Sequence, residues 1–185
     1  MFRAAMLYLA VLALLLTGCN RDGGGASKSS NIRIAVIPKG TTHEFWKSVE
    51  AGAKKAGDEF NVQIIWKGPL KEDEKNQQIA LVEQFVSDGV SGICLAPLDD
   101  TALLAPVKSA ANKKIPVVIY DSALKGEVGK DFVSFVATNN RVGGSMAGEE
   151  MLRLLGANKK VVLLRYKEGS ASTMEREAGS FDGLG

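Results

Sequence analysis

Short apolar runs alternate with amphipathic segments along the chain from Ile32 onward, and each kind of run predicts one kind of element. A continuous apolar run flanked by turn residues is typical of a strand buried on both faces, whereas apolar spacings of three and four predict a helix with one buried stripe. The runs predict strands over 32–37, 62–66, 92–95, 115–120, 132–137 and 160–165, and helices over 46–60, 72–87, after the acidic pair 99–100, and over 139–155. This alternation predicts an α/β fold with right-handed crossovers, a parallel sheet and helices on both faces.

The spacing also predicts which helical residues face the core and which residues begin the helices. The inward positions are Trp46, Val49, Ala53, Ala56, Phe60, Ile79, Val82, Phe85, Val86, Leu103, Val107 and Ala110. Thr41 and Thr42 carry hydroxyls that can cap the first helix, and Asn139 with Asn140 can cap the helix that follows them. The charged run KEDEK, which starts at Lys71, is expected to be a solvated helix start.

The loop between the first strand and the first helix is the main candidate for a ligand site. In open α/β sheets, ligands bind in the loops at the carboxyl ends of the strands. This loop carries a cation, two hydroxyls, an imidazole and two aromatic rings in the segment PKGTTHEFW, residues 38–46. Rings beside hydrogen-bonding groups suit a sugar, because the C–H face of a sugar packs on a ring while its hydroxyls need donors and acceptors.

Composition and charge exclude several classes of protein. The 185 residues are 45% hydrophobic and 24% charged, which is ordinary for a globular chain. The net charge of +2 comes with no basic patch, so no nucleic acid partner is expected. No candidate ligand-binding loop carries a nucleophile elbow, a histidine pair or paired carboxylates, and Asp121 lacks the general base or metal cluster of an enzyme. We therefore expect no catalysis, no cofactor and no metal.

The N-terminal segment predicts export. Residues 1–18 have one early cation and an apolar core from Leu7 to Leu16, which is typical of a signal peptide. The ending Leu16-Thr17-Gly18-Cys19 resembles the bacterial lipobox, which implies a lipid on Cys19; the alternative is an ordinary secretory signal with an incidental cysteine. Residues 19–31 are then a lipid-anchored, flexible tether rich in Gly and Ser. Cys94 lies among apolar neighbours and is expected to be an inert buried thiol.

Four segments in succession resemble one family. They are RIAVIPKGTTHEFWKSVEAGAKKAG, GVSGICLAPLDDTALLAPVKSAANKKIPVVIYDSAL, VSFVATNNRVGGSMAGEEM and GSASTMEREAGSFDGL. Their order and spacing resemble the ribose-binding-like branch of the type I periplasmic sugar-binding proteins of ABC transporters. The resemblance implies two similar α/β lobes, joined by three crossings, that close over a sugar. It places lobe one at 32–138 and the start of lobe two at 139–185, with the chain ending inside lobe two.

The resemblance also implies a set of ligand-binding residues. Phe45 and Trp46 match two aromatics that sandwich the sugar ring, although either ring could instead pack in the core. His43 matches a hydrogen-bonding position, and without the resemblance it is a surface loop residue. The remaining matches are Lys39 after strand one, Asp121 as the carboxylate that accepts from sugar hydroxyls, Ser122 where the family often has Arg, Asn139 at the first crossing, and Arg176 as a lobe-two donor or a surface charge.

The resemblance implies an exported lipoprotein receptor, in the periplasm or cell envelope, that binds a monosaccharide for an ABC transporter. Its partners would be the sugar, the permease subunits and the membrane through the lipid on Cys19, and we expect a monomer. Alternatives are a sugar sensor that presents its ligand to a membrane kinase or chemoreceptor, and a non-functional fragment of such a receptor. A repressor with the same core would need an N-terminal helix-turn-helix, whereas this N-terminus reads as a signal peptide and tether.

Overall fold

A computed structural model describes residues 32–156 and 158–185 of the chain. The predicted signal peptide, tether and lipidated Cys19 lie outside the described residues. The elements in chain order are β1 (Arg33–Ile37), α2 (Glu44–Phe60), β2 (Gln63–Trp66), α3 (Lys75–Ser87), β3 (Gly92–Leu95), α4 (Leu104–Asn112), β4 (Val117–Tyr120), β5 (Ser134–Val136), α5 (Asn140–Leu155) and α6 (Ala171–Leu184). Among the described residues, no helix has both the length and the apolar composition needed to cross a membrane.

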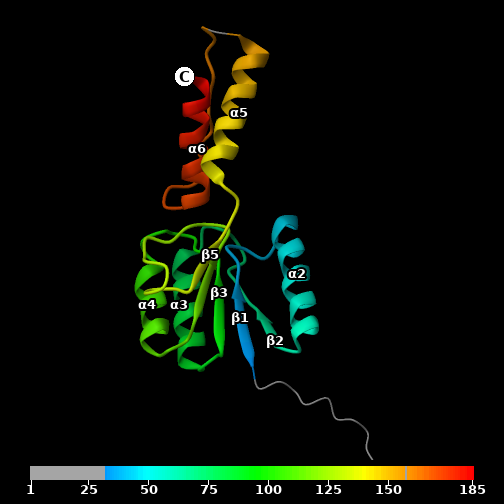
Figure 1. Ribbon diagram of the computed structural model, residues 1–185, viewed down its shortest axis with the longest axis vertical. Helices are drawn as coiled ribbons and strands as arrows, with labels where there is room; N and C mark the ends of the chain where they lie inside the picture. The colour runs from blue at the N-terminus through cyan, green and yellow to red at the C-terminus, as the bar shows by residue number, and fades with distance from the viewer. Residues whose placement is uncertain (1–31, 157) are drawn as a thin grey trace, which may run out of the picture.

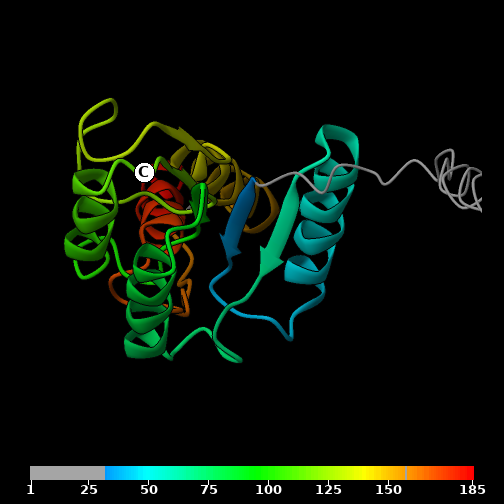
Figure 2. The same cartoon turned by 90° about the horizontal axis from the view of Figure 1, so that it is seen from below.

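The five strands form one parallel sheet in the order β2-β1-β3-β4-β5. In Figures 1 and 2, α3 and α4 lie on one face of the sheet and α2 lies on the other. Apolar side chains of β1, β3 and β4 pack with those of α3 and α4 in the main core. The α/β fold predicted from the alternating pattern is confirmed. We call residues 32–136 the α/β unit and residues 140–185 the helical arm.

The helical arm lies beyond the carboxyl ends of the strands, where α5 and α6 run side by side (Figure 1). The two helices approach so closely that their backbones touch. A Cβ atom built on Gly144 or Gly148 of α5 would overlap a backbone carbonyl of α6, and one on Gly179 or Gly183 of α6 would overlap a carbonyl of α5. Two glycines spaced four apart on each helix therefore interlock the pair.

The structure corrects the predicted strand at 160–165. Residues 159–166 form neither strand nor helix, and Val162 and Leu164 are 84% and 88% exposed. A strand needs a neighbour to accept and donate its backbone hydrogen bonds. All five strands of the described chain lie in the α/β unit, so this β-prone run has no partner.

Two predicted helix starts and one core position are also wrong. The helix expected from Glu72 begins at Lys75, and the helix expected after the acidic pair 99–100 begins at Leu104. Thr41 and Thr42 do not cap α2 as predicted: their hydroxyls donate to carbonyls of the 69–70 segment. The N-cap is His43, whose side chain makes no capping hydrogen bond. Phe60, in the last turn of α2, is exposed, whereas Trp46 and the predicted core residues of α3 and α4 are buried or partly buried.

Candidate functional site

The loops at the carboxyl ends of β1 and β4 meet the N-terminus of α6. Lys39 follows β1 after Pro38, and Asp121 with Ser122 follows β4 directly. Because parallel strands end at the same edge of a sheet, the topology brings these side chains together although they are about 80 positions apart in sequence. This edge is the one that faces the helical arm (Figure 1).

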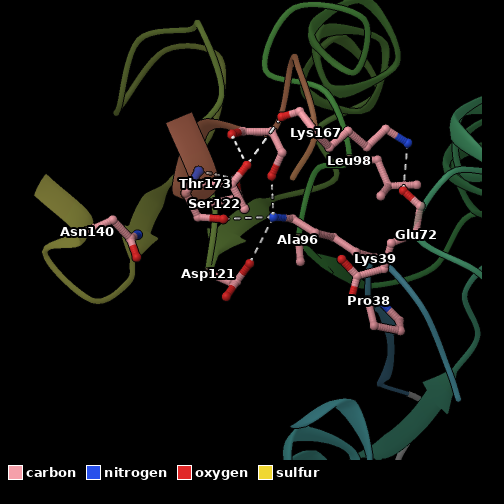
Figure 3. A network of polar contacts seen from close by, with 12 residues as sticks. Pro38, Lys39, Glu72, Ala96, Leu98, Asp121, Ser122, Asn140, Lys167 and Thr173 are labelled. Atoms are coloured by element: carbon pink, nitrogen blue, oxygen red, sulfur yellow. Dashed lines mark hydrogen bonds and ion pairs between the residues drawn. The ribbon is translucent and has the colours of Figure 1, made fainter. Parts of the chain in front are cut away.

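The ammonium group of Lys39 is at the centre of a buried polar cluster. Its Nζ lies 3.1 Å from Oδ2 of Asp121, 3.1 Å from Oγ of Ser170 and 3.0 Å from Oγ of Ser172. An ammonium group has three donors, so these partners use all of them. Figure 3 shows the side chains converging on the Lys39 nitrogen. Lys39 thereby connects the α/β unit to the first turn of α6.

The electrostatics of this cluster reflect its burial. Burial lowers the pKa of Lys39, and the carboxylate of Asp121 opposes that shift. Asp121 has a left-handed backbone, with φ at 63°, which is uncommon for a residue other than Gly and sparsely populated outside functional or turn sites. The left-handed turn after β4 aims the carboxylate at Lys39.

Two further buried side chains brace the cluster. The backbone N–H of Ser172 donates to Oγ of Ser122 at 3.0 Å, which adds a second link between the α/β unit and α6. Gln78 of α3 is fully buried, and it donates to the carbonyls of Pro38 and Ala96 at 3.0 and 2.8 Å and accepts from the N–H of Leu98 at 2.8 Å. Gln78 thus ties together the ends of β1 and β3.

A pocket of about 320 Å³ opens beside this cluster. Residues of the 40–46 and 70–73 segments line it on the α/β side, and Tyr166 with Lys167 lines it on the arm side. Glu72 is its central acid: Oε1 accepts from Nε1 of Trp46 at 2.7 Å, and Oε2 accepts from the hydroxyl of Tyr166 at 3.3 Å. Lys167 donates to the backbone carbonyl of Glu72 at 2.7 Å (Figure 3). Partial burial, together with the charge of Glu72, raises the pKa of Tyr166.

Only some of the predicted site residues of the first loop line this pocket. His43 and Trp46 line the pocket. Trp46 is only 2% exposed, and its ring also meets Tyr120 edge to face. Phe45 is 54% exposed, packs edge to face on Trp46 with ring centroids 4.8 Å apart, and is not among the lining residues. One ring of the pair is therefore buried and the other points to solvent.

Asn139 and Arg176 lie away from the Glu72 pocket. Asn139 is the N-cap of α5, where its side chain accepts from the N–H of Val142, as its type predicts. It lines a second pocket, of about 330 Å³, at the connection between β5 and α5. Arg176 is exposed on α6 and lines a shallow pocket with residues 163–166. The structure therefore groups Lys39, Asp121 and Ser122 in one cluster and His43 with Trp46 in the adjacent pocket.

The sequence did not predict the residues that the helical arm contributes to this site. Ser170 and Ser172 are buried partners of Lys39, and Tyr166 and Lys167 form one pocket wall. The reading of KEDEK as a solvated helix start is wrong for Glu72, which precedes α3 and accepts hydrogen bonds from three side chains. A carboxylate in the loop after a strand was the only available signal for Glu72.

Among the described residues, this edge of the sheet carries neither a cluster of metal ligands nor a reactive thiol. Within 32–156 and 158–185, no three His, Cys, Asp or Glu side chains gather in a way that could hold a metal ion. Cys94 is a free thiol in β3, and burial raises its pKa, which disfavours the thiolate. The chemistry present is that of hydrogen-bond donors and acceptors around a pocket, and such groups suit contact with a polar molecule.

Comparisons with known proteins place the chain in a family. Residues 34–185 match a family described as "Periplasmic binding protein domain". The chain is 29% identical over 181 residues to the D-ribose/D-allose-binding protein of Pseudomonas aeruginosa, covering 93% of this chain and 57% of that protein. It is 28% identical over 186 residues to the ribose import binding protein RbsB of Bacillus subtilis, covering 97% and 59%.

A solved structure shares the fold. It is an ABC transporter solute binding protein from Agrobacterium vitis with bound D-fucose, at 35% identity and a TM-score of 0.79, covering 82% of this chain and 53% of that one. The chain thus spans about half the length of the relatives it matches. The likeness confirms the predicted fold, in which the parallel sheet and its helices are of the type I periplasmic binding protein kind. The chain belongs to the periplasmic binding protein domain family.

Proposed function

We propose that this chain is the ligand-binding part of a solute receptor that binds a monosaccharide for an ABC transporter and catalyses no reaction. The observation that carries the proposal is the pocket of about 320 Å³, which both the α/β unit and the helical arm line. A concave site with a few converging polar groups, between two parts of a chain, is typical of small-molecule binding. The relatives that bind ribose, allose and fucose support a sugar as the ligand.

In this proposal, lobe one comprises residues 32–138 and lobe two begins at 139, with the sugar held between them. Lys39, Asp121 and Ser122 lie in the buried cluster beside the cleft, and His43 and Trp46 form the wall of the cleft on the lobe-one side. Closure of such a receptor is a hinge movement, and the ligand shifts the population toward the closed form. The transporter's permease subunits would be the protein partners of the monomeric receptor.

Ligand titration tests this proposal. The chain has two tryptophans, Trp46 and Trp66, so its intrinsic fluorescence reports on the pocket. We expect saturable changes, and matching heats in calorimetry, with at least one of D-ribose, D-allose, D-fucose, D-arabinose and D-tagatose. The change should vanish in Trp46→Phe and persist in Trp66→Phe. Heats no greater than buffer dilution for every sugar would refute the proposal.

The cell-envelope location and the anchor are a separate part of the proposal. We propose that the protein is exported and held at the membrane by a lipid on Cys19, and the sequence Leu16-Thr17-Gly18-Cys19 supports it. Metabolic labelling with radioactive palmitate in a bacterial host should label the parent chain and leave Cys19→Ser unlabelled. Equal labelling of both chains, or of neither, would contradict the anchor without affecting the binding proposal.

A further inference from the structure

The carboxylate of Glu72 connects two aromatic residues that come from different parts of the chain. One oxygen accepts from Trp46 of the α/β unit, and the other accepts from Tyr166 of the helical arm. The backbone carbonyl of the same residue accepts from Lys167. Glu72 is therefore the point at which both walls of the pocket are held in place.

The two connected rings differ in what they offer a ligand. Trp46 is 2% exposed, so it offers a ligand only an edge of the pocket wall. Its N–H group already donates to Glu72. Tyr166 is 64% exposed and lines the same pocket. Phe45 is exposed too, but it does not line the pocket. Among the Phe, Tyr and Trp side chains of the described chain, Tyr166 is the one that combines exposure with a place in this pocket wall.

The charges around the pocket balance one another. Its lining includes two cations, Lys71 and Lys167, and two carboxylates, Glu72 and Asp73. A lining without net charge gives no electrostatic advantage to an acidic or a basic ligand. Each charged group still supplies donors or acceptors for hydroxyls. The pocket therefore suits a neutral, hydroxyl-rich ring.

On the basis of the proposed sugar receptor function, we infer that Tyr166, held by Glu72, is the ring on which a neutral sugar packs in this pocket. Glu72 is a positioning residue, since it acts through Trp46 and Tyr166. The inference assigns the ring contact to the helical arm, whereas the family resemblance assigns it to Phe45 and Trp46. Closing the arm on the α/β unit then brings the stacking ring to the ligand.

Substitution of the ring is the first test, with D-allose as the probe and calorimetry on the full chain as the measurement. Tyr166→Ala should weaken binding about tenfold, because the apolar face of the sugar loses its contact area. Tyr166→Phe keeps the ring and should stay within about threefold of the parent. Leu164→Ala is the matched control: its side chain is exposed, two positions away and outside the pocket lining, so binding should not change.

Substitution of the carboxylate is the second test. Glu72→Gln keeps an oxygen that can accept from Trp46, so D-allose binding should stay close to that of the parent, whereas Glu72→Ala should weaken it about tenfold. The Gln variant also leaves the lining with one excess positive charge. Binding of D-glucuronate relative to D-allose should therefore improve about fivefold in Glu72→Gln, an effect that a merely structural role would not produce.

A third measurement follows the position of Trp46 without any ligand. In a Trp66→Phe background, Trp46 is the sole tryptophan, and its emission should shift in Glu72→Ala but not in Glu72→Gln. If the parent binds none of the tested sugars, the proposed function fails and this inference fails with it. If the parent binds but Tyr166→Ala binds equally well, or Phe45→Ala loses more affinity than Tyr166→Ala, the inference alone is overturned.

Discussion

The buried pair of Lys39 and Asp121 predicts an asymmetric response to mutation. The two side chains lie 3.1 Å apart, and they are 4% and 20% exposed. Asp121→Asn leaves an ammonium group in a site that water barely reaches, which should lower the free energy of unfolding by about 3 kcal/mol. Lys39→Met leaves a carboxylate with one face toward water, so the loss should be about 1–2 kcal/mol. The double variant should lose no more stability than Lys39→Met, because no buried charge without a counter-charge then remains.

The lowered pKa of Lys39 predicts how the free energy of unfolding changes with pH. Burial lowers the pKa of Lys39 below its usual 10.5, so at alkaline pH the unfolded chain binds more protons than the folded chain. Stability therefore rises with pH between the folded pKa and 10.5, and the penalty is fully present below the folded pKa. Removing the carboxylate lowers the pKa of Lys39 further, so Asp121→Asn should recover part of its loss at high pH. Lys39→Met should show no such recovery.

Urea unfolding, followed by circular dichroism at about pH 8 and about pH 10, measures both effects. The four chains of the cycle give the coupling energy between the two residues. If the two single variants lose equal stability, or if Asp121→Asn gains no more on the alkaline side than Lys39→Met does, then Lys39 is not a buried charge that depends on Asp121. The reasoning about this cluster would then be refuted.

Three further predictions test other parts of the structure. Gln78→Met should lower the free energy of unfolding by about 3 kcal/mol or more in urea titration, because three buried backbone groups lose their hydrogen bonds; a loss below about 1 kcal/mol would contradict their burial. Gly144→Ala places a methyl group on the carbonyl of Arg176, so it should lower stability by about 1–3 kcal/mol, whereas Gly143→Ala, which meets no atom within 4 Å, should be neutral or stabilising. Asn139→Ala should lower stability by about 1 kcal/mol through the lost cap of α5, and Asn139→Ser should restore most of it; equal thermal midpoints would rule out a capping role.

The pattern of apolar residues predicted the sheet because burial determines it. Each of the five strands is formed within two residues of its predicted range, since an apolar run between two turns has few other ways to be buried. The run at 160–165 has the same composition and forms no strand, because strand formation also depends on a neighbour that composition cannot reveal. Helix starts were shifted for a related reason: loop residues such as Glu72 are held by distant side chains and not by the helix.

Only the part of the candidate site that lies in the α/β unit was predictable from the sequence. Lys39 and Asp121 follow buried strands, and that position alone marks them as candidates at the sheet edge. Their partners Ser170 and Ser172 are small residues about 130 and 50 positions away, and nothing in the local sequence indicates that they fill the space around an ammonium group. Tyr166 follows a run expected to be a strand, so its place in a pocket wall depended on an arrangement that periodicity does not describe.

The interlocked glycines of α5 and α6 have a mechanical consequence. Because the carbonyls of each helix occupy space that any side chain on the other would fill, neither helix can roll or slide without its neighbour. A displacement of Ser172 at the start of α6 should therefore also move the first turn of α5, and with it the short connection at 137–139. The helical arm should therefore rotate as one rigid body about that connection. A molecule bound at one end of the arm would then set the orientation of the whole arm.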